Sequence, residues 1–130
     1  MKSIRLTVAA VAVVALLGAC SSSPSSSAAA SGGAAPADAD FTITSVDMQF
    51  DQDTLTVPAG EPFTLALVNE DTMPHNVAIY TDSSASEDLF VGEVVTDTTV
   101  VYDIPALEPG EYFFRCDLHP DMQGTLIVEG

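Results

Sequence analysis

The C-terminal segment GEYFFRCDLHPDMQGTLIVEG places three metal-binding side chains in one short loop. Cys116 ends a strand-like run, His119 and Met122 follow within six residues, and Gly124 leads into a second apolar run, Thr125–Val128. Thiolate, imidazole and thioether at the spacing C-x2-H-x2-M form the soft ligand set that suits copper. The fold must therefore bring at least one further ligand from another strand to this loop.

His75, in the sequence MPHNV, is the only other histidine, and Cys116 is the only cysteine after Cys20. Two histidines, one cysteine and a weak axial methionine make a blue-copper site. We therefore predict that His75, Cys116, His119 and Met122 hold one copper ion that cycles between Cu(I) and Cu(II). A buried apolar cysteine, a structural histidine and a methionine that fills the core are the alternatives.

Short β-prone runs broken by turn residues fill the chain from Phe41 onward, without helical periodicity of useful length. This pattern predicts an all-β fold, a Greek-key β-sandwich of about eight strands. The expected runs are Phe41–Val46, Leu55–Val57, Phe63–Val68, His75–Tyr80, Leu89–Val95, Thr98–Ile104, Glu111–Cys116 and Thr125–Val128. Tyr112, Phe114 and Cys116 share one face of their run, and His75 is in phase with Val77 and Ile79, so these ligands start from inward-facing rows.

The first nineteen residues have the composition of a secretory signal peptide. Lys2 and Arg5 precede an apolar run, Leu6–Leu17, that is shorter than the roughly 20 residues of a membrane span. The run ends in Leu-Gly-Ala-Cys, which resembles the cleavage box of bacterial lipoproteins and makes Cys20 the expected lipidated residue. An ordinary signal peptide with an incidental Cys20 is the alternative.

Residues 20–40 are rich in Ser, Ala, Gly and Pro, which predicts a flexible tether between a lipid anchor and a domain that spans residues 41–130. We expect the domain at the outer face of the cytoplasmic membrane. All nineteen acidic residues lie at or after Asp38, and Arg115 is the only Lys or Arg after Arg5. Without the predicted signal peptide, one base against nineteen acids gives the remaining chain a net charge of −18. This charge excludes nucleic acid as a partner and favours a basic protein surface. Solubility alone, or a high-salt medium, also explains it.

MPHNV around His75, with C-x2-H-P-x-M and G-x-L-x-V-E after it, resembles the cupredoxins, and the short ligand loop is most similar to that of the amicyanins. The resemblance implies copper ligation by His75, Cys116, His119 and Met122, a β-sandwich, and one-electron transfer between redox partners. It also implies that Asn76 ties the two ligand segments together in the outer shell. The acidity and the predicted anchor depart from the amicyanins, so the resemblance does not identify the partner.

Three protein ligands and a weak fourth leave no open position for a substrate, so we expect an electron carrier and not an enzyme. We also expect a monomer. The edge of His119, flanked by Pro120, Met73 and Pro74, is the expected docking patch and electron exit. A copper carrier that delivers Cu(I) to an exported enzyme is the second hypothesis, because the same soft ligands would serve it. Only Met48 and Met73 offer the domain further soft ligands outside the site.

Overall fold

The computed structural model describes residues 36–130. The predicted signal peptide, the lipidation of Cys20 and most of the predicted tether lie outside this range. The described residues form nine strands and no helix. Within this range there is accordingly no helix long and apolar enough to cross a membrane. The strands are β1 Phe41–Val46, β2 Gln49–Phe50, β3 Thr54–Pro58, β4 Phe63–Asn69, β5 Ala78–Tyr80, β6 Asp88–Val91, β7 Thr99–Ile104, β8 Gly110–Arg115 and β9 Gln123–Glu129.

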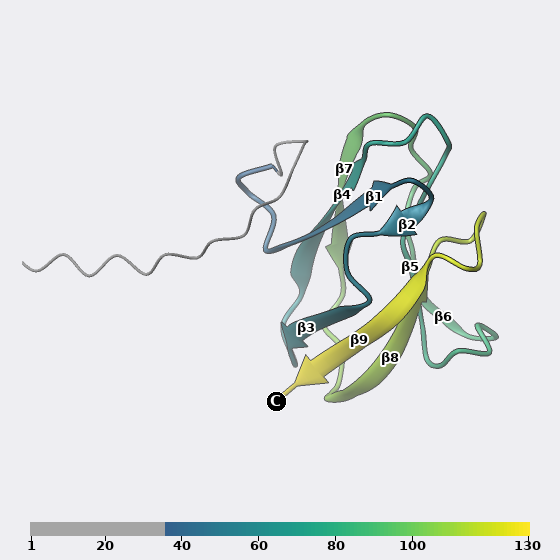
Figure 1. Ribbon diagram of the computed structural model, residues 1–130. Helices are drawn as coiled ribbons and strands as arrows, with labels where there is room; N and C mark the ends of the chain where they lie inside the picture. The colour runs from purple at the N-terminus through teal and green to yellow at the C-terminus, as the bar shows by residue number, and fades with distance from the viewer. Residues whose placement is uncertain (1–35) are drawn as a thin grey trace, which may run out of the picture. The chain divides into compact units, whose positions relative to one another are not determined.

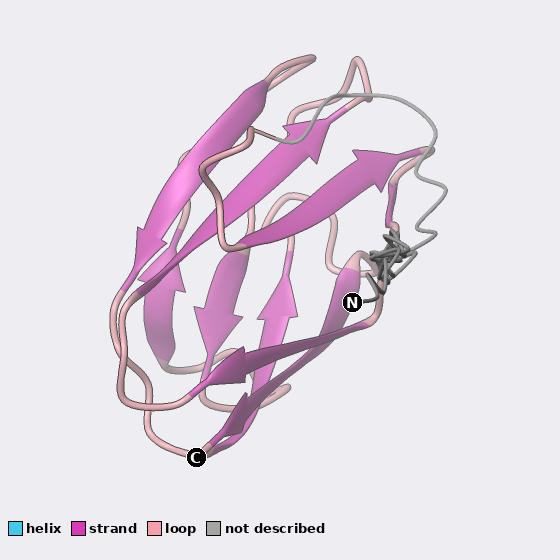
Figure 2. Cartoon of the chain, turned by 90° about the vertical axis from the view of Figure 1, so that its left-hand side faces the viewer, coloured by secondary structure: helices cyan, strands magenta, loops and turns pink. Residues whose placement is uncertain are grey.

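The strands make two sheets, in the orders β2-β1-β4-β7 and β3-β9-β8-β5-β6 (Figures 1 and 2). The pairs β1–β4 and β3–β9 are parallel, and the other pairs are antiparallel. The chain passes repeatedly from one sheet to the other. Two sheets without a helix among the described residues confirm the predicted all-β sandwich. The one strand that was not expected is β2, a two-residue strand paired with the end of β1.

The core lies between the inward faces of the two sheets, as period-2 alternation requires. Alternation is clearest in β3, where Leu55 and Val57 are buried between exposed neighbours. The largest buried side chains are Ile43, Leu65, Leu67 and Ile104 from the first sheet and Ile79, Phe114 and Leu126 from the second.

The segment expected to be a strand from His75 to Tyr80 forms regular strand only from Ala78. His75 makes an isolated bridge with Val95, and the Gly92 N–H donates to the Val77 carbonyl at 2.9 Å. The Asn76 side chain adds a bond to the Gly92 carbonyl at 3.2 Å, so this segment is joined to its neighbour by backbone and side-chain bonds without forming a regular strand.

The register of β5 on β8 brings the predicted ligands to one end of the sandwich. Ala78, the first residue of β5, pairs with Arg115, the last residue of β8. The two strands are antiparallel, so the segment before β5 and the loop after β8 emerge at the same edge of their sheet. His75 lies in the first of these segments, and Cys116, His119 and Met122 lie in the second.

Candidate metal centre

The loop between β8 and β9 is closed by its own backbone. The Cys116 N–H donates to the Met122 carbonyl at 2.9 Å, and the Met122 N–H donates to the His119 carbonyl at 2.9 Å. These two bonds hold the three predicted loop ligands in a tight turn. Cys116 and Met122 are buried, whereas His119 is partly exposed.

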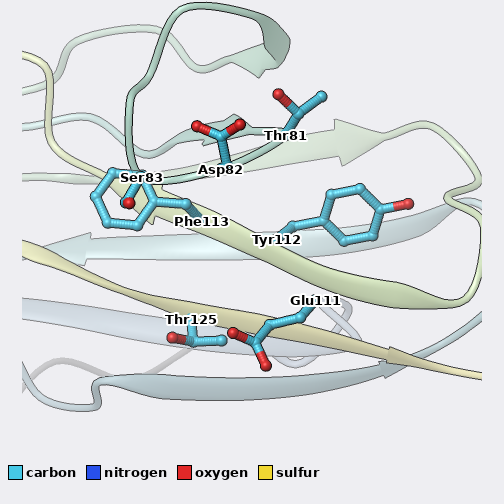
Figure 3. Close-up of a pocket in the computed structure, with 7 residues that line it drawn as sticks. All are labelled: Thr81, Asp82, Ser83, Glu111, Tyr112, Phe113 and Thr125. Carbon is cyan, nitrogen blue, oxygen red and sulfur yellow. The ribbon is translucent and has the colours of Figure 1, made fainter.

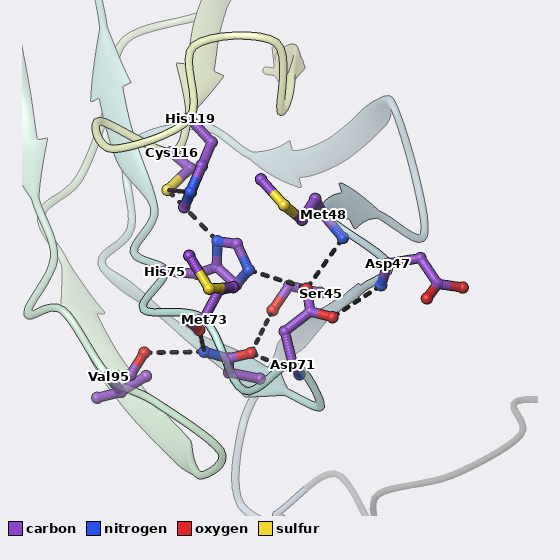
Figure 4. A network of polar contacts seen from close by, with 10 residues as sticks. Ser45, Asp47, Met48, Asp71, Met73, His75, Val95, Cys116 and His119 are labelled. Atoms are coloured by element: carbon purple, nitrogen blue, oxygen red, sulfur yellow. Dashed lines mark hydrogen bonds and ion pairs between the residues drawn. The ribbon is translucent and has the colours of Figure 1, made fainter.

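The Sγ atom of Cys116 lies 3.8 Å from Nδ1 of His75 and 3.7 Å from Nδ1 of His119 (Figure 4). One ligand atom from each of the three residues lies within 4.8 Å of the others. With the bond lengths that zinc makes to the same donors, about 2.3 Å to sulfur and about 2.0 Å to nitrogen, two bonds at 120° separate sulfur from nitrogen by about 3.7 Å. The three donors are therefore spaced as a trigonal metal plane requires.

The donor set decides which metal fits this spacing. One thiolate and two imidazoles, with the buried thioether residue Met122 in the same loop, suit copper. Cys116 is free and fully buried, so no disulfide competes for its sulfur within the described chain. The residues present fit a copper ion.

His75 is held more firmly than the other predicted ligands. Its side chain is fully buried, and its backbone exchanges two hydrogen bonds of 2.9 Å with Val95. Its ring lies 4.8 Å from the ring of His119, measured between centroids. The far ring nitrogen, Nε2, is 2.8 Å from Oδ2 of Asp71.

Asp71 was not predicted, because nothing in the sequence distinguishes it from the other acidic residues. In the structure its carboxylate lies behind the His75 ring and accepts hydrogen bonds from the turn after β1 (Figure 4). Burial raises the pKa of the Asp71 carboxyl, but hydrogen bonds from the Met48 N–H and the His75 ring outweigh burial and hold this pKa below its ordinary value of 3.8. Asp71 is therefore a carboxylate at neutral pH.

Asn76 joins the two ligand segments. Its Oδ1 accepts the Asp117 N–H at 2.9 Å, and its Nδ2 lies 3.3 Å from Oδ2 of Asp117. Asp117 directly follows Cys116 and also accepts the Tyr80 hydroxyl at 2.6 Å, a bond that raises the pKa of Tyr80. Asn76 was predicted to tie the two ligand segments together, whereas its partner Asp117 was not predicted.

Each of the residues predicted to form the docking patch with His119 is at least partly exposed. Met73 is 44 % exposed, Pro120 is exposed and Pro74 is partly exposed. Two further apolar side chains, Met48 and Leu118, are 45 % and 44 % exposed, and they line a shallow pocket with His119, Pro120 and Met122. Neither Met48 nor Leu118 was predicted to belong to the docking patch, because side-chain exposure depends on the fold.

A separate pocket of about 210 Å³ opens beside β8 (Figure 3). Its polar lining includes Thr81, Asp82, Glu111 and Thr125, and it contains no histidine, cysteine or methionine. Hydroxyls and carboxylates are hard ligands, so this pocket does not suit copper.

The sequence model of the Cupredoxin-like domain family matches residues 8–128, and the chain belongs to this family. It is similar to the amicyanin of Paracoccus versutus, with 38% identity over 97 residues, which cover 74% of this chain and 70% of that protein. The amicyanin of Paracoccus denitrificans is 28% identical over 96 residues, covering 74% of this chain and 70% of that protein.

The chain is also similar in fold to solved structures of an amicyanin and an auracyanin. The crystal structure of the P. versutus amicyanin matches with a TM-score of 0.57 and 38% identity, and the match covers 73% of this chain and 85% of that one. A dithionite-reduced auracyanin from Roseiflexus castenholzii matches with a TM-score of 0.62, covering 69% of this chain and 96% of that one. At 19% identity the auracyanin match supports the fold alone.

Membership in this family, together with the donor geometry, defines the cofactor and the kind of activity. The protein binds one copper ion and is an electron carrier rather than an enzyme. The predictions of copper as the cofactor, of a cupredoxin fold and of a non-enzymatic role are confirmed. The roles of the individual residues, the partner and the location stay predictions.

Proposed function

We propose that the protein is a membrane-tethered blue copper protein that carries single electrons between exported redox partners. The observation that carries the proposal is the position of two imidazole Nδ1 atoms at 3.7 and 3.8 Å from the sulfur of Cys116, a residue that is fully buried, as is His75. When bound, copper supplies a one-electron Cu(II)/Cu(I) couple.

The chain itself holds the ligand segments rigidly, keeps water away from the metal centre and provides an exit for the electron. The bridge to Val95 and the Asn76–Asp117 pair hold the ligand segments in one geometry, so little rearrangement accompanies a change of charge. His75 and Cys116 are fully buried, which keeps water away from them. His119 is the only one of the four predicted ligands that reaches the surface, so its ring edge is the proposed electron exit.

The absorption spectrum of the full chain, loaded with one Cu(II) and then reduced, tests this function. We expect an intense visible band from the thiolate–Cu(II) pair that disappears on reduction and returns on oxidation. Cys116→Ser should bind Cu(II) without this band, because it removes the thiolate. A colourless wild-type complex that binds Cu(I) tightly and Cu(II) poorly would contradict electron transfer and favour the copper carrier.

The proposed docking patch consists of Met73, Pro74, Pro120 and the edge of His119. Met73→Glu should slow electron exchange with a redox partner, because it places a charge on the apolar surface that a partner would cover. Val101→Glu is the matched control, since Val101 is 43 % exposed on β7 and the added charge is the same. Equal rates in the two variants would refute the patch.

The tether is proposed from the sequence alone. Mass spectrometry of the exported protein should find a lipid-sized mass increment on an N-terminal Cys20, and Cys20→Ala should release the domain from membranes. A mature protein with an unmodified Cys20 would refute the anchor but would leave the copper site unaffected.

A further inference from the structure

The carboxylate of Asp71 lies behind the buried ligand residue His75. Asp71 Oδ2 is 2.8 Å from His75 Nε2, while His75 Nδ1 faces the Cys116 sulfur. The two ring nitrogens thus have different neighbours, a carboxylate on one side and the donor cluster on the other. Since a carboxylate only accepts hydrogen bonds, Nε2 must carry the hydrogen, which leaves Nδ1 free to bind a metal.

The turn between β1 and β2 holds this carboxylate in place. The N–H of Asp47 donates to Asp71 Oδ1 at 2.8 Å, and the N–H of Met48 donates to Oδ2 at 3.0 Å. Asp47 and Met48 have φ values of 53° and 60°, a left-handed conformation that is unusual for residues other than glycine. Successive N–H groups in such a turn form a concave site for an anion.

A second set of hydrogen bonds fixes the backbone of Asp71. Its N–H donates to Oδ1 of Asn69 at 2.9 Å, and Asn69 also accepts the buried Ser45 hydroxyl at 3.0 Å. The Asn69 Nδ2 group donates to the carbonyls of Met73 and Val95 at 2.9 and 2.8 Å. This network ties Asp71 to the backbone of Met73, two residues before His75, and of Val95, which pairs with His75, and it leaves the carboxylate little freedom to turn away from the ring.

No Lys or Arg side chain among the described residues pairs with Asp71. Arg115, the only Lys or Arg in the described chain, forms its ion pair with Asp117. The Asp71 side chain is 14% exposed, so solvent screens it incompletely. A negative charge one imidazole ring away from a metal stabilises the more highly charged metal ion.

We propose that Asp71 is a positioning residue that fixes the tautomer and orientation of His75 and, through its charge, favours Cu(II) over Cu(I) and lowers the reduction potential. The inference deepens the proposed electron-transfer function and rests on it. Outer-shell carboxylates on ligand histidines orient the ring and raise its basicity, and their removal typically weakens metal binding about 10- to 100-fold.

Asp71→Asn tests the charge, because asparagine keeps the shape and one acceptor oxygen. We expect the variant to keep its visible band while the ratio of Cu(II) to Cu(I) affinity falls about tenfold, which for a one-electron couple is a rise in potential of about 59 mV. Asp121→Asn is the control: it removes the same charge from an exposed residue of the ligand loop whose side chain makes no hydrogen bond to a predicted ligand in the described structure. A shift for Asp71→Asn no larger than that for Asp121→Asn would overturn the proposal.

Nitrogen NMR of the copper-free wild-type protein at mildly alkaline pH tests the tautomer of His75. It needs no variant, so the result does not depend on whether a substituted chain folds. His75 should carry its hydrogen on Nε2, and a ring without an Nε2 hydrogen would overturn the proposal. Failure here is distinguishable from failure of the proposed function: a wild-type protein without a thiolate–Cu(II) band refutes electron transfer, whereas a blue wild-type protein with an unshifted Asp71→Asn variant refutes only the role of Asp71.

Discussion

At the scale of single residues, the four predicted ligands differ in how firmly the chain holds them. His75 is fixed by its backbone bridge to Val95 and by Asp71, whereas His119 lies partly exposed in a loop. Met122 closes that loop through its backbone, and its side chain is buried. A rigid inner ligand and an exposed outer one suit a site that must keep its geometry and still pass an electron to the surface.

Met122→Gln should keep copper bound and change the reduction potential, because the weak axial ligand tunes the couple while the thiolate and imidazoles hold the metal. The backbone bonds of Met122 to Cys116 and His119 do not depend on its side chain, so the loop should keep its shape. Copper stoichiometry and voltammetry check the two halves of the prediction. Loss of copper would show that Met122 holds the metal rather than tunes it.

At the scale of the elements, the ligand loop depends on how closely β8 and β9 approach each other. Gly124 pairs with Phe114, and a Cβ added at Gly124 would lie 2.4 Å from the Phe114 ring and 2.6 Å from the Asp53 carbonyl oxygen. This crowding is a packing requirement for glycine. From the sequence, Gly124 was predicted only to lead into the last apolar run.

Gly124→Ala should lower the free energy of unfolding by about 1–3 kcal/mol, because the added methyl group overpacks the core against backbone atoms that cannot move aside. Gly110→Ala is the matched control in the same hairpin, since its added Cβ would meet nothing closer than 3.7 Å. Denaturant unfolding of both copper-free variants gives the comparison. Equal stability would mean that the strands separate at little cost.

The sequence predicts those features that depend on neighbouring residues, and it does not predict those that depend on contacts between distant segments. The strands follow from alternation and turn residues, and β1 has the predicted bounds. The spacing of Cys116, His119 and Met122 is also local. Asp71 could not be predicted, because its role depends on a turn at Asp47 and Met48 that reaches it only in the folded chain. The late start of β5 likewise depends on a long-range contact, that of Asn76 with Gly92.

At the scale of the whole molecule, the described chain is strongly acidic, and some of its acidic residues lie beside the metal centre. The described chain carries nineteen acidic residues and one base, Arg115, and that base is paired with Asp117. The pocket beside His119 has both apolar and acidic lining residues, the former being Met48, Leu118 and Pro120 and the latter Asp47 and Asp121. We expect a basic partner to be drawn to the whole domain, and the apolar side chains of this pocket to select where it docks.

The rate of electron transfer from the reduced protein to a small cationic metal complex should fall as salt rises from about 0.01 M to about 1 M, since the Debye length shrinks from about 30 Å to about 3 Å. The rate to an anionic complex should rise over the same range. Stopped-flow absorption of the copper band measures both rates.

Two double variants then locate the charges that matter. Asp47→Asn with Asp121→Asn removes two acids that line the pocket beside His119, and Glu108→Gln with Glu129→Gln removes two near the opposite end of the β8–β9 hairpin. If acidity serves steering, the first pair should flatten the salt dependence more than the second, because a screened field acts mainly near the electron exit. Equal effects from the two pairs would instead assign the acidity to solubility or to a high-salt medium.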